Sequence, residues 1–420
     1  MPPTLTTPAP SSPPAPVYLD HAATTRVLEE VVEVVARTMR DASLGNASSL
    51  HAAGRSARRV VEESRERIAQ ALGVRPSEVL FTSGGTESDN LAIKGTYAAR
   101  VAGTGRRDRL VVSSIEHHAV LDSVEHLIAS QAARVTWIEP DQDGLITPQA
   151  LTAALEADGG PDTAALVSVM WANNEVGTVQ PVPQLAEIAH AHGIPLHSDA
   201  VQALGQVALD LSTVDLGVVT GHKIGGPLGV GVLTAGRDQS PVPLSHGGGQ
   251  ERSLRSGTLD TPAIAGLAEA IALAVEHQDA HATRLVGLRD TLIEGALALD
   301  QGITVTGPWT PGDRARRLPA NAHLRVADCD SDSLLYLLDA AGIACSTGSA
   351  CSAGVARASH VLLAMGIPQE EARGALRLTL GRTSTQADVQ AFLCALPGAL
   401  ERARRAHQSG PAVAAAEVTL

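Results

Sequence analysis

The sequence is short of aromatic and basic side chains. Only 2% of its 420 residues are Phe, Trp or Tyr, so the core has to be built from Ala, Val and Leu. Acidic side chains outnumber basic ones by 45 to 32, which gives a formal net charge of −13. Since nucleic acids and anionic membranes bind to basic surfaces, neither is expected as the main partner. The 44% share of apolar residues indicates a globular chain rather than a disordered one.

Cysteine is scarce, and long apolar runs are missing. The four cysteines are too few for a disulfide framework and contain no C-x-x-C pair, which favours a reducing compartment. No apolar run reaches the roughly 18 residues that a membrane span needs. Residues 1–16, MPPTLTTPAPSSPPAP, have no charged side chain and lack the apolar centre of a signal peptide. We therefore expect a cytoplasmic protein whose residues 1–16 form a disordered tail.

Lysine is rarer still. Of the 32 basic residues 30 are arginines, and only Lys94 and Lys223 are lysines. A reaction that needs an amine able to lose its proton therefore has two candidate residues.

The chain is expected to fold into two units. An amphipathic helix over 55–72 ends at Gly73, and short apolar runs then alternate with helical stretches. This alternation predicts a large α/β domain with a mainly parallel sheet over 17–265. The remaining pattern predicts a small α+β domain over 266–405 and a C-terminal tail over 406–420. The strands of the large domain are expected at 79–82, 110–113, 166–170, 194–197, 216–220 and 230–233.

Ligands of parallel α/β sheets bind at the carboxyl ends of the strands, so the residues after each apolar run are informative. Run 79–82 is followed by SGGTESDN, whose glycines and helix start suit an anion and whose Thr86 adds a hydroxyl. An ordinary capped helix start is the alternative. Glu116, His117 and His118 follow the next run. Adjacent histidines rarely share a metal ion, so a single His stacked on or hydrogen-bonded to a ligand is favoured over a zinc site.

Amides and an acid follow the third and fourth runs. Asn173, Asn174 and Glu175 come after the third run, where a polar turn is the alternative to a ligand site. Asp199 and Gln202 come after the fourth. Because apolar residues flank Asp199 closely on both sides, we expect its carboxylate to be partly enclosed rather than to be a solvated cap.

The fifth run, 216–220, is followed by Gly221, His222 and Lys223 and then by several glycines. No G-x-x-x-x-G-K-[ST] is present here, which excludes a P-loop, and G-P-L-G-V-G does not open a dinucleotide fingerprint after a strand. A lysine just past a buried strand, in a chain with only one other lysine, is favoured as a reactive amine over a solvated side chain.

One cofactor needs all of these groups together. Pyridoxal 5′-phosphate takes a lysine for a Schiff base, a carboxylate at its ring nitrogen, a group over its ring, and donors for its phosphate. The matching residues are Lys223, Asp199, His117, and the pair Gly85 and Thr86. The sequence therefore predicts a pyridoxal-phosphate site and no metal site.

Residues 345–354, CSTGSACSAG, have almost only small side chains and lie between an apolar segment and a helix that starts near Ser359. Such a stretch buries little area and is expected to be mobile, so a thiol in it can reach a bound ligand. The flanking small residues favour exposure of Cys351. For Cys329, Cys345 and Cys394 we expect the ordinary role of a buried structural cysteine.

Between YLDHAATT at Tyr18 and LGRTST at Ser384 the chain resembles the cysteine desulfurases, in the branch that serves iron-sulfur cluster assembly and nitrogenase maturation. The resemblance implies the aspartate-aminotransferase-like fold, fold type I of pyridoxal-phosphate enzymes, and a homodimer with both active sites near the subunit interface. The stretches that carry it are GNASSLHAAGR, FTSGGTESDNLAIKG, IEHHAVLDS, ANNEVGTVQPV, HSDAVQALG, GHK, HGGGQERSLRSGT, STGSACSAG and SHVLLAMG.

The resemblance also implies roles for single residues. Lys223 binds the cofactor covalently, His117 stacks on its ring, Asp199 pairs with the ring nitrogen, and Gln202 bonds the phenolic oxygen. Asn174 lies beside the cofactor. The residues implied to hold the phosphate are Gly85, Thr86, Thr220 and His222, joined by Thr258 of the other subunit.

In this family Arg377 binds the substrate carboxylate, a role that suits its planar fork, and Cys351 accepts the sulfur. The implied reaction converts L-cysteine to L-alanine and leaves a persulfide on Cys351, for iron-sulfur cluster assembly or tRNA thiolation through an acceptor protein. The alternatives are another enzyme of this fold, such as a selenocysteine lyase, an epimerase or an aminotransferase, and a non-enzymatic scaffold. Departures from the family pattern are Ala47, Gly225 and VARA at 355–358.

Overall fold

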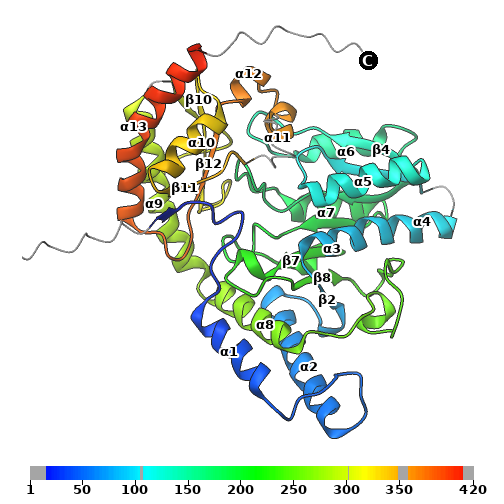
Figure 1. Cartoon of the computed structure of the whole chain (residues 1–420). Helices are drawn as coiled ribbons and strands as arrows, with labels where there is room; N and C mark the ends of the chain where they lie inside the picture. Colours follow the sequence, from blue (N-terminus) through cyan, green and yellow to red (C-terminus); the bar gives the residue numbers. More distant parts are fainter. Residues whose placement is uncertain (1–15, 105–106, 301, 349–357, 410–420) are drawn as a thin grey trace, which may run out of the picture.

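The computed structural model describes residues 16–104, 107–300, 302–348 and 358–409. Two sheets organise this part of the chain: a seven-stranded sheet between layers of helices, and a three-stranded sheet packed on long helices (Figure 1). Apolar clusters on both faces of the large sheet form the first core, and a cluster around the small sheet forms the second. Within the described residues no helix is both long and apolar enough to span a bilayer.

The large sheet has the strand order β2-β8-β7-β6-β5-β3-β4, and β8 is the one strand of this sheet that runs against its neighbours. The mainly parallel α/β fold predicted from the sequence is therefore confirmed. The strands are β2 (Val79–Thr82), β3 (Arg109–Ser113), β4 (Arg134–Ile138), β5 (Ala164–Ser168), β6 (Leu196–Asp199), β7 (Leu216–Thr220) and β8 (Gly231–Ala235).

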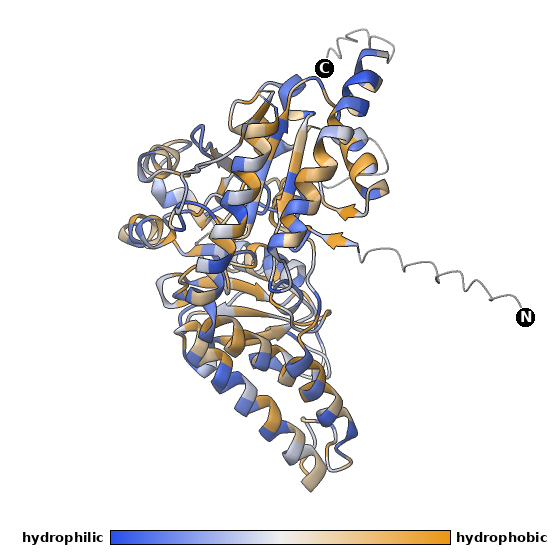
Figure 2. Cartoon of the chain, turned by 90° about the vertical axis from the view of Figure 1, so that its left-hand side faces the viewer, coloured by the Kyte–Doolittle hydropathy of each residue, from blue (hydrophilic) through white to orange (hydrophobic). Residues whose placement is uncertain are grey.

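Helices cover both faces of this sheet, which is why its central strands read as unbroken apolar runs. Figure 2 shows these strands in orange and tan between helices that carry hydrophilic residues. One face packs against α3 (Gly85–Asn90), the π-helix η2 (Leu91–Gly95), α4 (Thr96–Thr104) and α5 (His118–Gln131). The other packs against α2 (Ala52–Leu72), α6 (Pro148–Glu156), α7 (Val182–Ala191) and α8 (Thr261–Glu276).

Helix α2 ends where the sequence predicts. Gly73 adopts a left-handed backbone with φ of 73°, and its N–H bonds to the Ala69 carbonyl, which is a typical glycine helix stop. The apolar positions of the predicted face, among them Val61, Ile68 and Leu72, are buried in the core of the large sheet.

The second core is built around the antiparallel sheet β12-β10-β9. Strand β1 (Val17–Tyr18) pairs in parallel with β11 (Ile343–Ala344), so the first described residues join this core. Helix α8 packs in the first core and α9 in the second, so the chain passes from one core to the other at His277 between these helices. The other elements are α1 (Glu29–Arg40), α9 (Gln278–Leu299), β9 (Ile303–Val305), β10 (Asn321–Val326), α10 (Ser331–Ala340), α11 (His360–Ala364), α12 (Gln369–Ala372), β12 (Ala375–Thr379) and α13 (Gln386–Ser409).

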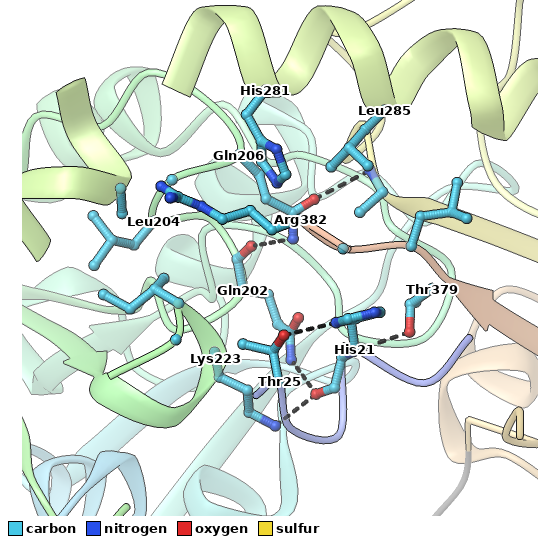
Figure 3. A pocket seen from close by; sticks show the side chains of 18 of the residues that line it. His21, Thr25, Gln202, Leu204, Gln206, Lys223, His281, Leu285, Thr379 and Arg382 are labelled. Carbon is cyan, nitrogen blue, oxygen red and sulfur yellow. Dashed lines mark hydrogen bonds between the residues drawn. The ribbon is translucent and has the colours of Figure 1, made fainter. Parts of the chain in front are cut away.

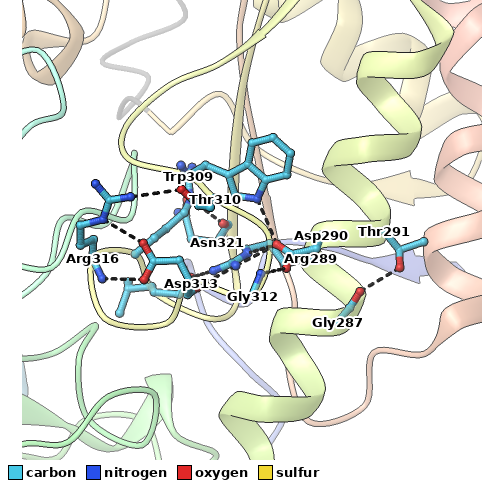
Figure 4. A network of polar contacts seen from close by, with 12 residues as sticks. Gly287, Arg289, Asp290, Thr291, Trp309, Thr310, Gly312, Asp313, Arg316 and Asn321 are labelled. Atoms are coloured by element: carbon cyan, nitrogen blue, oxygen red, sulfur yellow. Dashed lines mark hydrogen bonds and ion pairs between the residues drawn. The ribbon is translucent and has the colours of Figure 1, made fainter.

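A polar network fixes the long connection between β9 and β10 (Figure 4). Arg289 of α9 is fully buried and pairs with Asp290, which also accepts a hydrogen bond from Trp309 Nε1 at 3.0 Å. Arg317, also fully buried, donates to backbone carbonyls and to Asn321 Oδ1. Because each buried guanidinium meets several acceptors, the connection is held in one conformation.

This connection in turn braces the turn at 173–178 from outside. The backbone N–H of Val179 bonds to the Arg316 carbonyl and that of Leu318 to the Gly177 carbonyl, and Asn321 Nδ2 donates to the Glu175 carbonyl at 2.8 Å. The turn that carries the predicted site residue Asn174 is thus held between both cores.

Candidate active site

The site residues predicted from the strand ends lie at one edge of the large sheet. Strands β2, β3, β5, β6 and β7 all run in the same direction, so their carboxyl ends share this edge. Segments that are distant in sequence are thereby brought to a common place, as ligand sites of open α/β sheets require.

Lys223 lies in the short helix η5 (Gly221–Lys223), directly after β7. Its Nζ donates to the backbone carbonyls of Ala22 at 2.6 Å and Ala23 at 2.7 Å. Burial, and then the positive charge of Arg377, lower the pKa of Lys223 to about 8. The amine is therefore close to losing its proton at neutral pH, as a nucleophile or base requires.

Gln202 shares an acceptor with this lysine, since its Nε2 donates to the Ala22 carbonyl at 3.0 Å. Figure 3 shows both side chains at the wall of a cavity of about 270 Å³. Gly225 also lines the cavity, has a φ of 80°, and would place a Cβ only 2.6 Å from Leu28 Cγ. Leu28 thus occupies the space toward which a larger side chain at position 225 would point, which explains why glycine is found there.

Asp199 ends β6 and is only 6% exposed. Its Oδ1 accepts the Val201 N–H at 2.8 Å. Burial, and then the nearby carboxyl of Asp89, raise the pKa of Asp199 to about 6, while His117 acts in the opposite direction. A buried carboxyl whose pKa is raised by burial and by Asp89 but lowered by His117 can pair with a cationic ring nitrogen.

His117 caps α5, and its Nδ1 accepts the Ala119 N–H at 3.1 Å. Burial lowers the pKa of His117, so the ring is neutral at neutral pH. With Nδ1 used as an acceptor, the proton of the neutral ring lies on Nε2. His117 can therefore donate from Nε2.

The predicted phosphate-binding groups surround the start of α3. Gly84 has a φ of 148°, and a Cβ on Gly231 of the neighbouring strand β8 would lie 2.8 Å from the Gly84 Cα. Glycine is thus needed at both positions. Gly85 and Thr86 form the first turn of a helical run that continues to residue 104, and its first N–H groups lack helical acceptors.

Thr220 and His222 flank this turn from the end of β7. Thr220 Oγ1 donates to the Val230 carbonyl at 3.2 Å, and His222 Nδ1 lies 3.2 Å from Thr24 Oγ1. Burial lowers the pKa of His222 to about 4, so the side chain is neutral at neutral pH. Thr258 is exposed, in the connection between the short helix η6 (Glu251–Ser253) and α8.

Arg377 of β12 is 5% exposed and links both cores to the site. It donates to the Asn174 carbonyl at 3.0 Å and pairs with Asp20 Oδ1 at 2.8 Å. Its Nε is buried without a hydrogen-bonding partner among the described residues. Ser346 and Arg377 exchange two backbone hydrogen bonds, so the start of the cysteine-containing segment lies beside this guanidinium.

Cys351 lies in segment 349–357, outside the described residues. Cys329 and Cys345 are buried, as expected, and burial raises the pKa of Cys345 to about 12. The expectation for Cys394 is wrong, because this residue is exposed. On α13 the buried stripe runs through Phe392 and Leu396, and Cys394, two residues from each, lies off this stripe.

The sequence pattern at the strand ends predicts no role for Asp20 or Glu175. Asp20 belongs to the YLDHAATT stretch, but its partner is 357 residues away, which no local pattern reveals. Glu175 is 2% exposed and accepts a hydrogen bond from Ser359 Oγ, and a Cβ on Gly348 would lie 3.4 Å from Glu175 Cγ. Glu175 thus contacts the chain on both sides of segment 349–357.

Comparisons with known proteins agree with this geometry. The chain is 53% identical over 391 residues to an "IscS-like cysteine desulfurase" of Mycobacterium tuberculosis, covering 93% of this chain and 97% of that protein. It is 40% identical to "Cysteine desulfurase IscS" of Methanosarcina thermophila, covering 92% and 93%.

Solved structures agree as well. A "NIFS-LIKE PROTEIN" superposes with a TM-score of 0.82 at 34% identity, over 92% of this chain and all of the other. "SspA in complex with cysteine" superposes with a TM-score of 0.72 at 34% identity, over 86% of this chain and 98% of the other. The family model for class-V aminotransferases matches residues 17–392. The chain therefore belongs to the class-V aminotransferase family.

Proposed function

We propose that this protein is a cysteine desulfurase that converts L-cysteine to L-alanine and transfers the sulfur to Cys351 as a persulfide. The observation that carries the proposal is that an amine and a guanidinium lie near each other beside the sheet edge. Lys223 offers a half-buried amine whose pKa is about 8, and Arg377 offers a buried guanidinium next to the chain that leads to Cys351. Relatives at 53% and 40% identity are named cysteine desulfurases, which supports the same reaction.

Enzymes of the class-V family use pyridoxal 5′-phosphate, and this is the cofactor of the chain. The donor set fits it. Lys223 supplies the amine for covalent attachment and Asp199 a buried carboxylate for the ring nitrogen, while His117 and Gln202 are assigned to the ring and its phenolic oxygen. We assign the phosphate to the N–H groups at the start of α3 and to the side chains of Thr86, Thr220 and His222.

The bound cofactor supplies an electron sink for the charge that develops at the substrate Cα. The protein has to move the protons. We assign removal of the Cα proton to Lys223 Nζ, because its lowered pKa leaves part of the amine uncharged near neutral pH. His117 Nε2 is the second proton carrier, since its Nδ1 is already engaged by the Ala119 N–H.

Arg377 is assigned to the carboxylate of L-cysteine. Its bonds to Asp20 and to the Asn174 carbonyl hold the guanidinium plane, while its buried Nε lacks an acceptor within the described part of the chain. A substrate carboxylate would bind to a guanidinium that is already oriented, and Asn174 would lie beside the bound substrate.

The sulfur step is assigned to Cys351. Its thiolate attacks the substrate Sγ, an S–S bond forms, and the Cβ–Sγ bond of the substrate breaks. The electron pair of that bond remains on the carbon skeleton, which takes up a proton at Cβ, regains one at Cα and leaves as alanine. No outside oxidant is needed, because the reduction of the carbon balances the oxidation of the thiol to a persulfide.

The oligomeric state, the location in the cell and the sulfur acceptor are also part of the proposal. We infer a two-domain cytoplasmic homodimer in which the exposed Thr258 of one subunit reaches the phosphate site of the other. The persulfide would pass to an acceptor protein for iron-sulfur cluster assembly or tRNA thiolation.

The test is turnover of L-cysteine by the purified holoenzyme, with alanine and, in the presence of a thiol reductant, sulfide measured separately. Equal amounts of the two products are expected. Selenocysteine and amino-acid/keto-acid pairs are assayed in parallel. Turnover of one of these without alanine formation from L-cysteine would show that the protein is another enzyme of the family.

A further inference from the structure

A polar cluster that the assignments above do not use lies beneath α3. Asp89 of α3 and His197 of β6 are 1% and 0% exposed, and their Oδ1 and Nε2 atoms lie 3.2 Å apart. In the described parts of the chain neither atom has a hydrogen-bonding partner, so the 3.2 Å contact is not a hydrogen bond from a His197 Nε2–H to Asp89. The other ring nitrogen, His197 Nδ1, lies 2.9 Å from Ser168 Oγ on the adjacent strand β5.

The cluster adjoins the carboxylate assigned to the cofactor ring. His197 and Asp199 are two residues apart on β6, so their side chains leave the same face of the sheet. Asp89 reaches this face from α3, four residues after the helix start at Gly85. The Asp89–His197 contact therefore joins the helix assigned to the phosphate with the strand assigned to the ring nitrogen.

The surroundings do not favour charge on either partner. Burial raises the pKa of Asp89 well above its usual value, and burial lowers the pKa of His197 to about 4. Two further buried carboxyls face the pair, Asp199 and Glu116, and an ionised Asp89 would repel both. The basic groups near Asp199, His117 and Lys223, are those assigned to the reaction.

We propose that Asp89 and His197 form a neutral hydrogen-bonded pair that positions Asp199 without placing a second negative charge beside it. The Asp89 carboxyl O–H donates to His197 Nε2, and His197 Nδ1–H donates to Ser168 Oγ. The proposal rests on the proposed function only in that Asp199 is taken as the partner of the cofactor ring. Asp89 and His197 are positioning residues, because they act through β6 and α3.

The protonation state is tested by infrared spectroscopy on the purified holoenzyme at neutral pH, comparing the wild type with Asp89→Asn. Glu116 is present in both proteins and cancels in the difference. We expect the difference spectrum to contain the carbonyl stretch of a protonated carboxylic acid, displaced to lower frequency in D2O. Carboxylate stretching bands in its place would overturn the proposal.

The positioning role is tested by the dissociation constant of pyridoxal phosphate, measured from visible absorbance. Asn keeps the size and a donor toward His197 Nε2, so Asp89→Asn should bind within about twofold of the wild type. Asp89→Leu removes the donor and should weaken binding by about tenfold or more, as expected when a buried partner is lost. The exposed Asp122 of α5 gives the matched control Asp122→Leu, which should bind as the wild type does.

Two binding results would overturn the positioning role: Asp89→Leu binding as tightly as the wild type, or Asp89→Asn binding as weakly as Asp89→Leu. If Asp89→Leu does not fold, Asp89→Asn and its infrared spectrum still decide. Neither readout uses turnover of L-cysteine, so a protein that binds the cofactor but does not desulfurate cysteine would refute the proposed function and leave this inference intact.

Discussion

Arg377 and Asp20 form an ion pair of 2.8 Å across 357 residues of sequence, and both lie where the proposed substrate binds. The acid belongs to the first described segment and the guanidinium to a strand of the second core. This pair fixes the direction of the guanidinium before any substrate arrives, which lowers the cost of ordering it on binding.

Replacement of Arg377 by lysine should raise the KM for L-cysteine by roughly tenfold to a hundredfold, because a point charge cannot reproduce the two-pronged contact with a carboxylate. Steady-state kinetics of the purified variant measure this. Arg325→Lys on the neighbouring strand β10 is the control, since Arg325 pairs with Glu371 outside the site. An unchanged KM in Arg377→Lys would remove Arg377 from the substrate site.

Lys223→Ala should abolish covalent attachment of pyridoxal phosphate and reduce turnover by at least about a hundredfold, the smallest effect typical of losing a general base. Borohydride reduction followed by mass spectrometry of peptides locates the attachment. The chain provides one matched control, Lys94→Ala, because Lys94 is the other lysine. An adduct on Lys94, or none on either lysine, would contradict the assignment.

Cys351→Ser should abolish sulfide release while leaving the visible absorbance of the bound cofactor unchanged. The thiol is required for S–S bond formation but not for cofactor binding. Cys394→Ser serves as control, because Cys394 is exposed on the outer face of α13. Loss of cofactor absorbance in Cys351→Ser would indicate a structural role, and full activity would favour a reaction that needs no acceptor thiol.

Lys223 should also impose a pH dependence on the stability of the cofactor-free protein. Its pKa falls from 10.5 to about 8 on folding, so the unfolded chain binds the extra proton between these values. The contribution of this residue is thus fully favourable above pH 10.5 and is lost as the pH falls through 8. At pH 7, Lys223→Met should be the more stable protein by about 3 kcal/mol.

Urea unfolding of both cofactor-free proteins across this pH range measures the difference. The advantage of Lys223→Met should shrink as the pH rises from 8 to 10.5. A constant difference over the whole range would mean that the amine is not depressed in the folded state.

Much of the architecture could be predicted from the sequence. The runs at 79–82 and 216–220 coincide with β2 and β7. Strands that are buried on both faces consist of consecutive apolar residues, and the polar residues that follow them mark where each strand ends. The predicted helix over 55–72 begins three residues earlier, at Ala52, where His51 caps it through a side-chain contact that was not anticipated.

The position of a candidate site residue could be predicted where it ends or directly follows a strand of the parallel sheet, as Asp199 and Lys223 do. It could not be predicted where a side chain acts through tertiary contact. Glu175 reads as part of a polar turn, and its role as a contact for Ser359 appears only after folding. The exposure of Cys394 could not be predicted from its neighbours in sequence. Helix α13 has both a buried and an exposed face, and only the packed structure shows on which face Cys394 lies.

The pairing of β1 with β11 has a consequence for synthesis of the protein. Strand β11 leads directly into the stretch with Cys351, the proposed sulfur acceptor, yet its partner is made more than three hundred residues earlier. On the ribosome the first strand stays unpaired until residue 344 has left the exit tunnel. Asp20 stays without its ion-pair partner until Arg377 has also left the tunnel. The reactive end of the molecule therefore assembles late, after most of the large sheet is available to fold.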